Sequence, residues 1–163
     1  MADTNLVLNF TMEEQVMSFW CWAAVAKSTF VFYAPGSNRW TQCKIAKIVC
    51  TKPTCCTNPP GCNDSKRLSD ALRVTGNYVN ERAGTITWMD IKTEINAGRL
   101  VCARIQWNEG GGHFVSIYGV SKIGNSIKVY IADSIYGISI MTFTQFKNNY
   151  RSSGSWSRTY FSN

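Results

Sequence analysis

Cys21 opens an apolar segment, Trp20 to Ala26, that contains no Gly or Pro and favours a helix. A thiol in the first turn of a helix lies at the positive end of the helix dipole, beside free N–H groups, and both stabilise the nucleophilic thiolate. Gln15, six residues upstream, could point amide N–H donors at an oxyanion that forms beside this sulfur. The alternative interpretation is a small cysteine buried in the core of a helix.

His113 is the only histidine of the chain, and it follows three glycines, Gly110 to Gly112. Glycines let a backbone bend or approach a substrate closely, which suits a catalytic base. Asp133 ends the next predicted strand. If residues 113–122 and 126–133 form a hairpin, Asp133 comes near the imidazole and can orient its ring. A histidine after an ordinary hairpin turn and an aspartate facing solvent are the alternatives.

These four residues together supply the nucleophile, base, orienting carboxylate and oxyanion donor of covalent acyl transfer. Such chemistry needs no metal and no organic cofactor. We predict that Gly111 and Gly112 form one wall of a peptide-binding cleft. Trp20 is predicted to line a subsite, with core packing as the alternative.

The elements that must hold these residues follow from hydrophobic periodicity and turn residues. We expect an α+β fold with a single domain over residues 1–163, in which a helical half (about 12–98) packs against a β-rich half (about 99–163) with an antiparallel sheet. Helices are predicted at 20–33, 40–50, 66–75, 87–97 and 144–150, the fourth with a capping box between Thr87 and Asp90. Strands are predicted at 5–11, 100–107, 113–122, 126–133, 138–143 and 156–161.

Composition narrows the partners of the chain. Its 163 residues carry a net charge of +7, but the basic residues are scattered singly, whereas proteins that bind nucleic acids usually cluster them. No stretch approaches the roughly 20 apolar residues of a membrane helix, and no signal peptide is visible. We therefore expect a monomer that acts on a protein or peptide, without nucleic acid or membrane.

Seven cysteines are present, five of them between positions 43 and 62. The odd number fits three disulfides and one free thiol, and Cys21 is the natural one to stay free. A zinc site is the alternative, but the irregular spacing disfavours it. The disulfides predict an oxidising environment. The candidates are Cys43, Cys50, Cys55, Cys56, Cys62 and Cys102.

The sequence resembles the papain-like cysteine peptidases, and most closely the small bacterial C70 and C39-like group that contains the AvrRpt2-type effector proteases. The similar motifs are Gln15-x-x-Ser18-x-Trp20-Cys21-Trp22-Ala23-Ala24, Trp40-Thr41-Gln42-Cys43 with Ala46, Cys55-Cys56, Cys62-Asn63, Gly112-His113-Phe114, Asp133-Ser134 and Gly154-x-Trp156-x-x-Tyr160. They lie in the expected order over nearly the whole chain.

The resemblance implies a thiol endopeptidase with Cys21 as nucleophile, His113 as base, Asp133 as the third member of the triad and Gln15 in the oxyanion hole. It also implies a secreted protein or one delivered into a target cell. Cys50 and Cys102 have no place in the family pattern, and we predict an extra disulfide between them. The alternatives are a transglutaminase-like or leader-peptide processing enzyme with the same triad, and a non-catalytic, disulfide-stabilised binding module.

Overall fold

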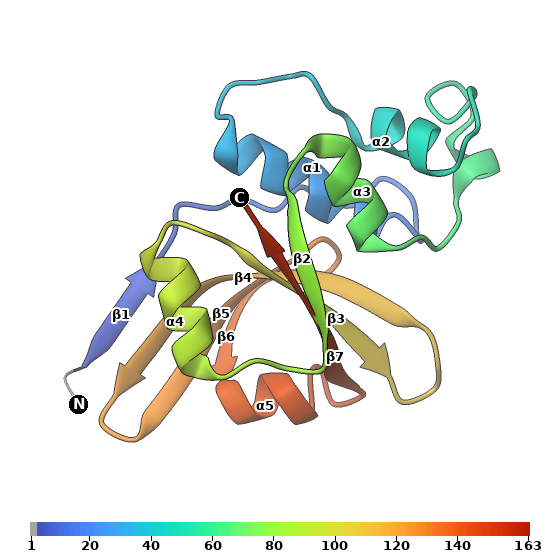
Figure 1. Cartoon of the computed structure of the whole chain (residues 1–163). Coiled ribbons are helices and arrows are strands. Elements are labelled where there is room, and N and C mark those ends of the chain that lie inside the picture. The colour runs from blue at the N-terminus through green and yellow to red at the C-terminus, as the bar shows by residue number, and fades with distance from the viewer. Residues whose placement is uncertain (1–2) are drawn as a thin grey trace.

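The computed structural model describes residues 3–163, and its central element is an antiparallel sheet of seven strands (Figure 1). The strands are β1 (Thr4–Val7), β2 (Tyr78–Ala83), β3 (Val101–Trp107), β4 (Gly112–Ile123), β5 (Ser126–Asp133), β6 (Gly137–Thr142) and β7 (Gly154–Ser162). Their order is β2-β7-β3-β4-β5-β6, and β1 pairs with β4 outside this path. The N-terminal strand therefore joins the sheet formed by the C-terminal half.

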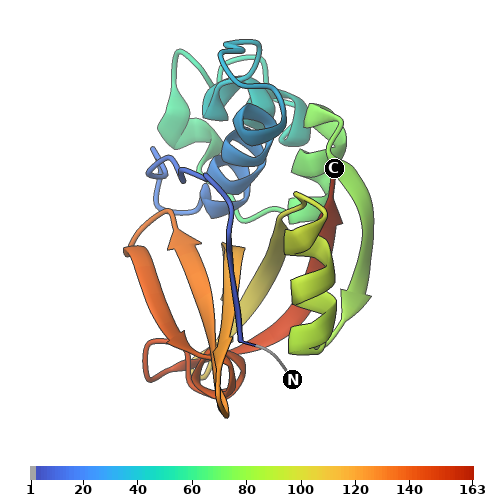
Figure 2. The ribbon, with the colours of Figure 1, turned by 90° about the vertical axis from the view of Figure 1, so that its left-hand side faces the viewer.

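Within residues 3–163, five α-helices and one short 3-10 helix pack against the sheet or against one another. They are α1 (Cys21–Tyr33), α2 (Gln42–Val49), η1 (Pro59–Cys62), α3 (Leu68–Thr75), α4 (Trp88–Asn96) and α5 (Phe143–Asn148). The first three α-helices pack on one another above one end of the sheet, while α4 and α5 lie beside and below it (Figures 1 and 2). This arrangement confirms the predicted α+β class, with N-terminal helices packed against a C-terminal antiparallel sheet.

Alternating side chains of the strands fill the two larger of three hydrophobic clusters in the described chain. Cys102, Phe114 and Tyr160 face the helices α1 and α3, whereas Ile105, Val115 and their alternate neighbours face α4 and α5. Alternation along a strand places successive side chains on opposite faces. His113 and Asp133 stand two residues from Val115 and Ile131, so they belong to the rows that fill the second cluster.

Two segments of the predicted helical half, β2 and α4, contact the sheet. Strand β2 pairs with β7 at the sheet edge, and α4 packs against β1, β3 and β4. The capping box of α4 is present, because the Thr87 side chain accepts from the Asp90 N–H and the Asp90 side chain accepts from the Thr87 N–H. The division of the chain into domains stays a prediction.

Four of the six candidate cysteines are paired, as Cys43–Cys56 and Cys55–Cys62. The predicted disulfide between Cys50 and Cys102 is wrong, because both thiols are free. Cys50 ends α2, whereas Cys102 lies fully buried in the middle of the sheet, with its sulfur 3.7 Å from the Ser116 hydroxyl. Within residues 3–163, no helix is long and apolar enough to cross a membrane.

Candidate active site

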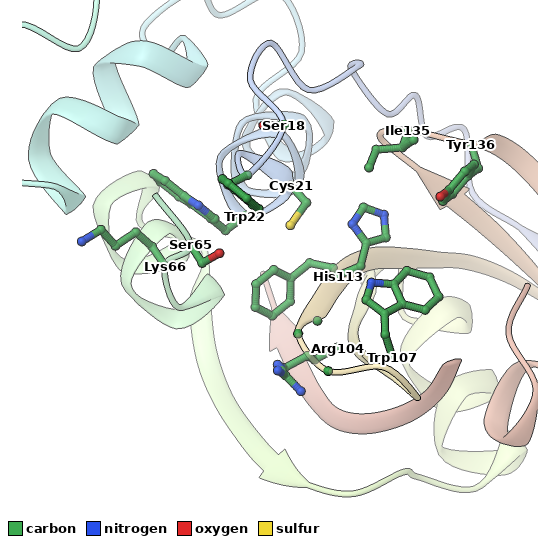
Figure 3. A pocket seen from close by; sticks show the side chains of 15 residues that line it. Ser18, Cys21, Trp22, Ser65, Lys66, Arg104, Trp107, His113, Ile135 and Tyr136 are labelled. Carbon is green, nitrogen blue, oxygen red and sulfur yellow. The ribbon is translucent and has the colours of Figure 1, made fainter. Parts of the chain in front are cut away.

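Cys21 is the first residue of α1, a helix whose first six residues are all buried. Its side chain reaches the floor of a cleft of about 430 Å³ between the helices and the sheet, with 7% of the residue exposed (Figure 3). The backbone N–H of Cys21 is one of the four at a helix start that have no intrahelical acceptor. The position therefore joins a thiol to a free N–H donor at the positive end of a helix.

The loop before Cys21 is held by residues 62–64, the first of which, Cys62, forms the disulfide with Cys55. Asn63 accepts from the Phe19 N–H at 2.9 Å and donates to the Ser18 hydroxyl at 2.8 Å. The indole N–H of Trp20 donates to the Cys62 carbonyl at 2.8 Å. These contacts fix the chain on the N-terminal side of the thiol, and their residues act by positioning it.

The prediction that Trp20 lines a subsite is wrong. Its side chain is fully buried beneath the loop, where it packs into the core that the helices form with the sheet. The hydrogen bond to Cys62 uses its only polar atom. Trp107 lines the cleft instead, whereas Trp22 adjoins it with a fully buried side chain.

His113 and Asp133 meet as the hairpin predicts. The two-residue turn Gly124-Asn125 joins β4 to β5. The register places Asp133 opposite Val115, which lies two residues after His113 on the same face of β4. His113 Nε2 lies 2.8 Å from Asp133 Oδ1, and both side chains are almost completely buried. Figure 3 shows the Cys21 side chain beside the imidazole, and this thiol helps to raise the pKa of His113. The imidazole thus lies between the sulfur and the carboxylate.

The Asp133 carboxylate has further hydrogen bonds. Its Oδ1 accepts from the backbone N–H groups of Ile135 at 2.8 Å and Tyr136 at 3.1 Å, and its Oδ2 accepts from the Tyr150 hydroxyl at 2.6 Å. Both oxygens are therefore fixed. No sequence motif marked Tyr150, because only the fold brings α5 and its following residues beneath β5.

The charge state of the pair follows from these contacts. Burial works to lower the pKa of His113, but its hydrogen bonds to Asp133 and Cys21 outweigh burial and raise this pKa from 6.5 to about 9. Burial works to raise the pKa of Asp133, but the hydrogen bond and charge of His113 hold this pKa below its ordinary value. Burial and the Asp133 charge raise the pKa of Tyr150, which therefore stays a donor. At neutral pH the site contains an imidazolium–carboxylate pair.

Aromatic rings enclose the imidazole. The Trp107 ring stacks on it, with centroids 6.0 Å apart and planes 18° apart, and the Tyr136 ring meets it edge to face at 6.3 Å. The Arg151 guanidinium covers the Tyr136 ring at 3.8 Å from the centroid. These rings limit the access of water to the His113–Asp133 hydrogen bond.

Gly111 and Gly112 lie in the wall of the cleft, directly before His113 in the chain. Gly110 and Gly111 have φ values of 100° and 76°, which suit glycine and allow the turn between β3 and β4. At Gly112, an added Cβ would lie 2.6 Å from the Arg104 guanidinium. Their contact with a substrate stays a prediction.

The sequence predicts that the Gln15 amide points its N–H donors toward the space beside the Cys21 sulfur, but in the structure the amide is hydrogen-bonded to other groups. Its Nε2 donates to the carbonyls of Met17 at 2.9 Å and Ser18 at 2.7 Å, and its Oε1 accepts from the Ser134 hydroxyl at 2.9 Å. The Gln15 backbone N–H also donates to the Ser134 carbonyl at 3.1 Å. Gln15 thus joins the loop before Cys21 to the turn after Asp133, and its part in an oxyanion hole stays a prediction.

Among the described residues, no group of three or more His, Cys, Asp or Glu side chains is arranged to hold a metal ion. The sequence profile described as Peptidase_C39 like family matches residues 7–158. The matched region runs from the end of β1 into β7 and includes Cys21, His113 and Asp133. No curated protein matches the chain.

Proposed function

The chain belongs to the Peptidase_C39-like family and is a cysteine peptidase, and from this premise we propose that it is a thiol endopeptidase with Cys21, His113 and Asp133 as its triad. The observation that carries the proposal is the position of the His113 ring, whose Nε2 lies 2.8 Å from Asp133 Oδ1 while the Cys21 side chain lies beside the ring in the same cleft. This is the geometry that a thiolate–imidazolium pair requires.

In the proposed reaction, the Cys21 thiolate attacks the carbonyl carbon of a peptide bond. The carbonyl oxygen becomes an oxyanion that accepts from the Cys21 backbone N–H. His113 gives its Nδ1 proton to the leaving nitrogen, the C–N bond breaks, and a thioester remains. Water then attacks the thioester while His113 takes up a proton, and cleavage of the C–S bond restores the thiolate and the imidazolium.

Gln15 is proposed as the second oxyanion donor. Its Nε2 lies at the carbonyl of Ser18, three residues before the nucleophile, so one N–H would have to turn from this carbonyl to the oxyanion when substrate binds. Loss of one such donor typically lowers kcat about 10²–10³-fold. A Gln15→Ala variant is therefore expected to be impaired and still measurably active.

Hydrolysis of a fluorogenic peptide library tests the endopeptidase activity. We expect the intact protein to cleave internal bonds and the Cys21→Ala variant to cleave none. Cys50→Ser is the matched control, because it removes a free thiol outside the cleft. Proteolysis by pure Cys21→Ala protein would refute the proposal. Products joined to an added amine would assign the triad to acyl transfer instead.

Alkylation with iodoacetamide at pH 7 gives a second readout. Burial raises the pKa of Cys50, and it raises the pKa of Cys102 to about 11, so both thiols should react slowly. Cys21 should be labelled first, with loss of activity in proportion to labelling. Equal rates at the three thiols would contradict an activated Cys21.

We also propose that the protein is a secreted or delivered monomer, related in function to the AvrRpt2-type effectors. The two disulfides support this location, since such bonds persist in oxidising compartments. Mass spectrometry under non-reducing conditions should find both disulfides intact in protein recovered outside the producing cell. Fully reduced cysteines in active protein from a native source would overturn the proposed location.

A further inference from the structure

Besides the His113 imidazolium, which is paired with Asp133, the cleft beside Cys21 contains two cationic side chains, Lys66 and Arg104, and no carboxylate among its lining residues in the described chain. Lys66 lies just before α3, and Arg104 lies in the middle of β3. Both are partly buried. Within residues 3–163, neither of them takes part in an ion pair. The cleft therefore has positive charge that no protein group neutralises.

Arg104 is held in place by neutral partners. Its Nη1 donates to Gln106 Oε1 at 2.7 Å and to the Ser157 hydroxyl at 3.2 Å. The guanidinium lies so close to the backbone of Gly112 that a Cβ there would be 2.6 Å from Nη2. Glycine thus lets the cation lie at the cleft wall next to His113. Its remaining N–H groups can donate to a ligand, since a guanidinium has five.

Two acidic groups of the adjoining segments, Glu81 and Asp64, have other partners. Arg158 is opposite Arg104 in the β3–β7 pairing, and it forms an ion pair with Glu81 at 3.4 Å. Asp64, two residues before Lys66, pairs with Lys52 at 3.2 Å. Neither of these two carboxylates therefore pairs with Lys66 or Arg104.

The cleft differs on the two sides of the catalytic pair. Figure 3 shows Ser65 and Lys66 on one side of the Cys21 sulfur and Trp107, Tyr136 and Ile135 on the other, around His113, while Arg104 lies below the sulfur, apart from Lys66. A bound peptide would therefore meet Arg104 near the catalytic pair, Lys66 further along the cleft, and aromatic and apolar side chains around His113. This asymmetry can select among peptides by charge.

We propose that Arg104 forms a subsite for a carboxylate, with Lys66 adding positive charge further along the cleft, so that the peptidase prefers substrates with an acidic residue near the scissile bond. The inference rests on the proposed endopeptidase function and specifies its substrate class. A guanidinium matches a carboxylate with two parallel N–H donors, and a lysine ammonium adds a point charge. The carboxylate comes either from an Asp or Glu side chain or from the C-terminus of a short peptide.

Equilibrium binding to the Cys21→Ala protein tests the subsite separately from turnover. Capped, amidated octapeptides of Ala, Gly and Ser carry one Glu or one Gln at each position in turn, and a second set has a free C-terminal carboxylate and no Glu. We expect one position at which Glu binds about tenfold more tightly than Gln, as for a charged hydrogen bond of this kind. Preference confined to the free C-terminus would instead identify the terminal carboxylate as the ligand.

Variants of the two cations then show which side chain is responsible for the preference for Glu over Gln. In the Cys21→Ala background, Arg104→Gln should reduce the Glu preference to within about twofold, Lys66→Gln should reduce it in part, and Arg104→Lys should retain some of it. Lys128→Gln is the matched control, because this exposed lysine lies at the end of β5 away from Asp133. Thermal melting confirms that each variant folds.

The outcomes separate this inference from the proposed function. Equal dissociation constants for Glu and Gln peptides at every position, with no preference for a free C-terminus, would overturn the subsite even if the active protein cleaves peptides. The same holds if the preference survives loss of both cations. Preferential binding without any hydrolysis by the active protein would support the subsite and refute the endopeptidase alone. The Glu preference should also weaken in high salt, because partly exposed charges are screened.

Discussion

Replacement of Asp133 by Asn tests the charge pair at the centre of the site. The change keeps the shape of the side chain and one acceptor oxygen, but it removes the negative charge that faces His113 Nε2 at 2.8 Å. An amide group can also present N–H donors to the ring, which would select the wrong imidazole tautomer. Hydrogen bonding from Tyr150 can continue to the remaining oxygen, so the variant is expected to fold.

The magnitude follows from the pKa of His113. Its rise from 6.5 to about 9 corresponds to about 3 kcal/mol in favour of the imidazolium. Because this folded-state pKa lies above the unfolded value, the stabilisation is complete below about pH 6.5 and is lost as the pH rises through about 9. Loss of an opposite charge in direct contact typically changes a pKa by about 1–3 pH units, so the pKa of His113 should fall by that amount in Asp133→Asn.

Two assays read this change. His113 is the only histidine, so a single imidazole Hε1 resonance reports its titration by NMR without further assignment. The pH profile of kcat/KM on a cleaved peptide should keep activity up to about pH 9 in the intact protein, and the alkaline limb should move to lower pH in Asp133→Asn. The activity at pH 7 should fall on the order of 10²–10⁴-fold, as when a triad carboxylate is replaced elsewhere.

Two results would refute this reasoning. The first is an intact protein whose imidazole titrates near 6.5, which would mean that burial outweighs the hydrogen bonds of Asp133 and Cys21. The second is an Asp133→Asn protein with an unchanged titration and an unchanged alkaline limb. Cys21→Ala is the companion variant, since it removes the other group that raises the pKa of His113 and leaves the carboxylate in place.

Three further predictions concern the groups around this pair. Tyr150→Phe keeps the ring but removes a 2.6 Å hydrogen bond to the buried carboxylate, so it should cost about 2 kcal/mol and lower Tm by about 4–8 °C; calorimetry showing an unchanged Tm would contradict this. Gly112→Ala should displace the Arg104 guanidinium and lower the ratio of kcat/KM for Glu over Gln peptides about fivefold, and an unchanged ratio would place the cation elsewhere. Replacing Cys55 and Cys62 by Ser should lower the free energy of unfolding by about 2.5 kcal/mol in urea denaturation, as expected for so short a loop, and stability equal to that of the intact protein would show that the disulfide restrains little.

The hairpin that carries His113 and Asp133 could be predicted from the sequence because its information is local. Two alternating segments flank the Gly124-Asn125 turn, and this spacing alone brings the far ends of the strands together. The start of α1 at Cys21 could be predicted for the same reason. The register required the structure, because a bulge between Ile117 and Gly119 shifts the pairing.

Contacts between distant segments were not predictable in this way. The sequence leaves Trp20 open between a cleft subsite and core packing, and only the structure shows that its indole is buried and that its N–H pairs with a carbonyl 42 residues away. Tyr150 carries no local signal of its contact with Asp133. Strand β2 was missed because it is an edge strand whose residues are mostly partly or fully exposed, so the alternation that marks a half-buried strand is weak.

The cysteine count led to one error. An odd number of cysteines predicted three disulfides, but parity contains no information on where the thiols lie. Cys50 and Cys102 occupy separate environments, one at the end of α2 and the other inside the sheet. Burial raises the pKa of both thiols, so we expect each to react slowly without a bond between them.

The two hydrogen bonds between Gln15 and Ser134 have a consequence for what can enter the cleft. They tie the loop before α1 directly to the turn after β5, so the two walls cannot swing apart about a hinge without breaking both bonds. We expect a cleft whose walls are joined in this way to admit a peptide chain that already lies extended and to exclude a folded domain. The targets of this peptidase should therefore be cut in tails, exposed loops or interdomain segments, and stable domains should survive it until they unfold.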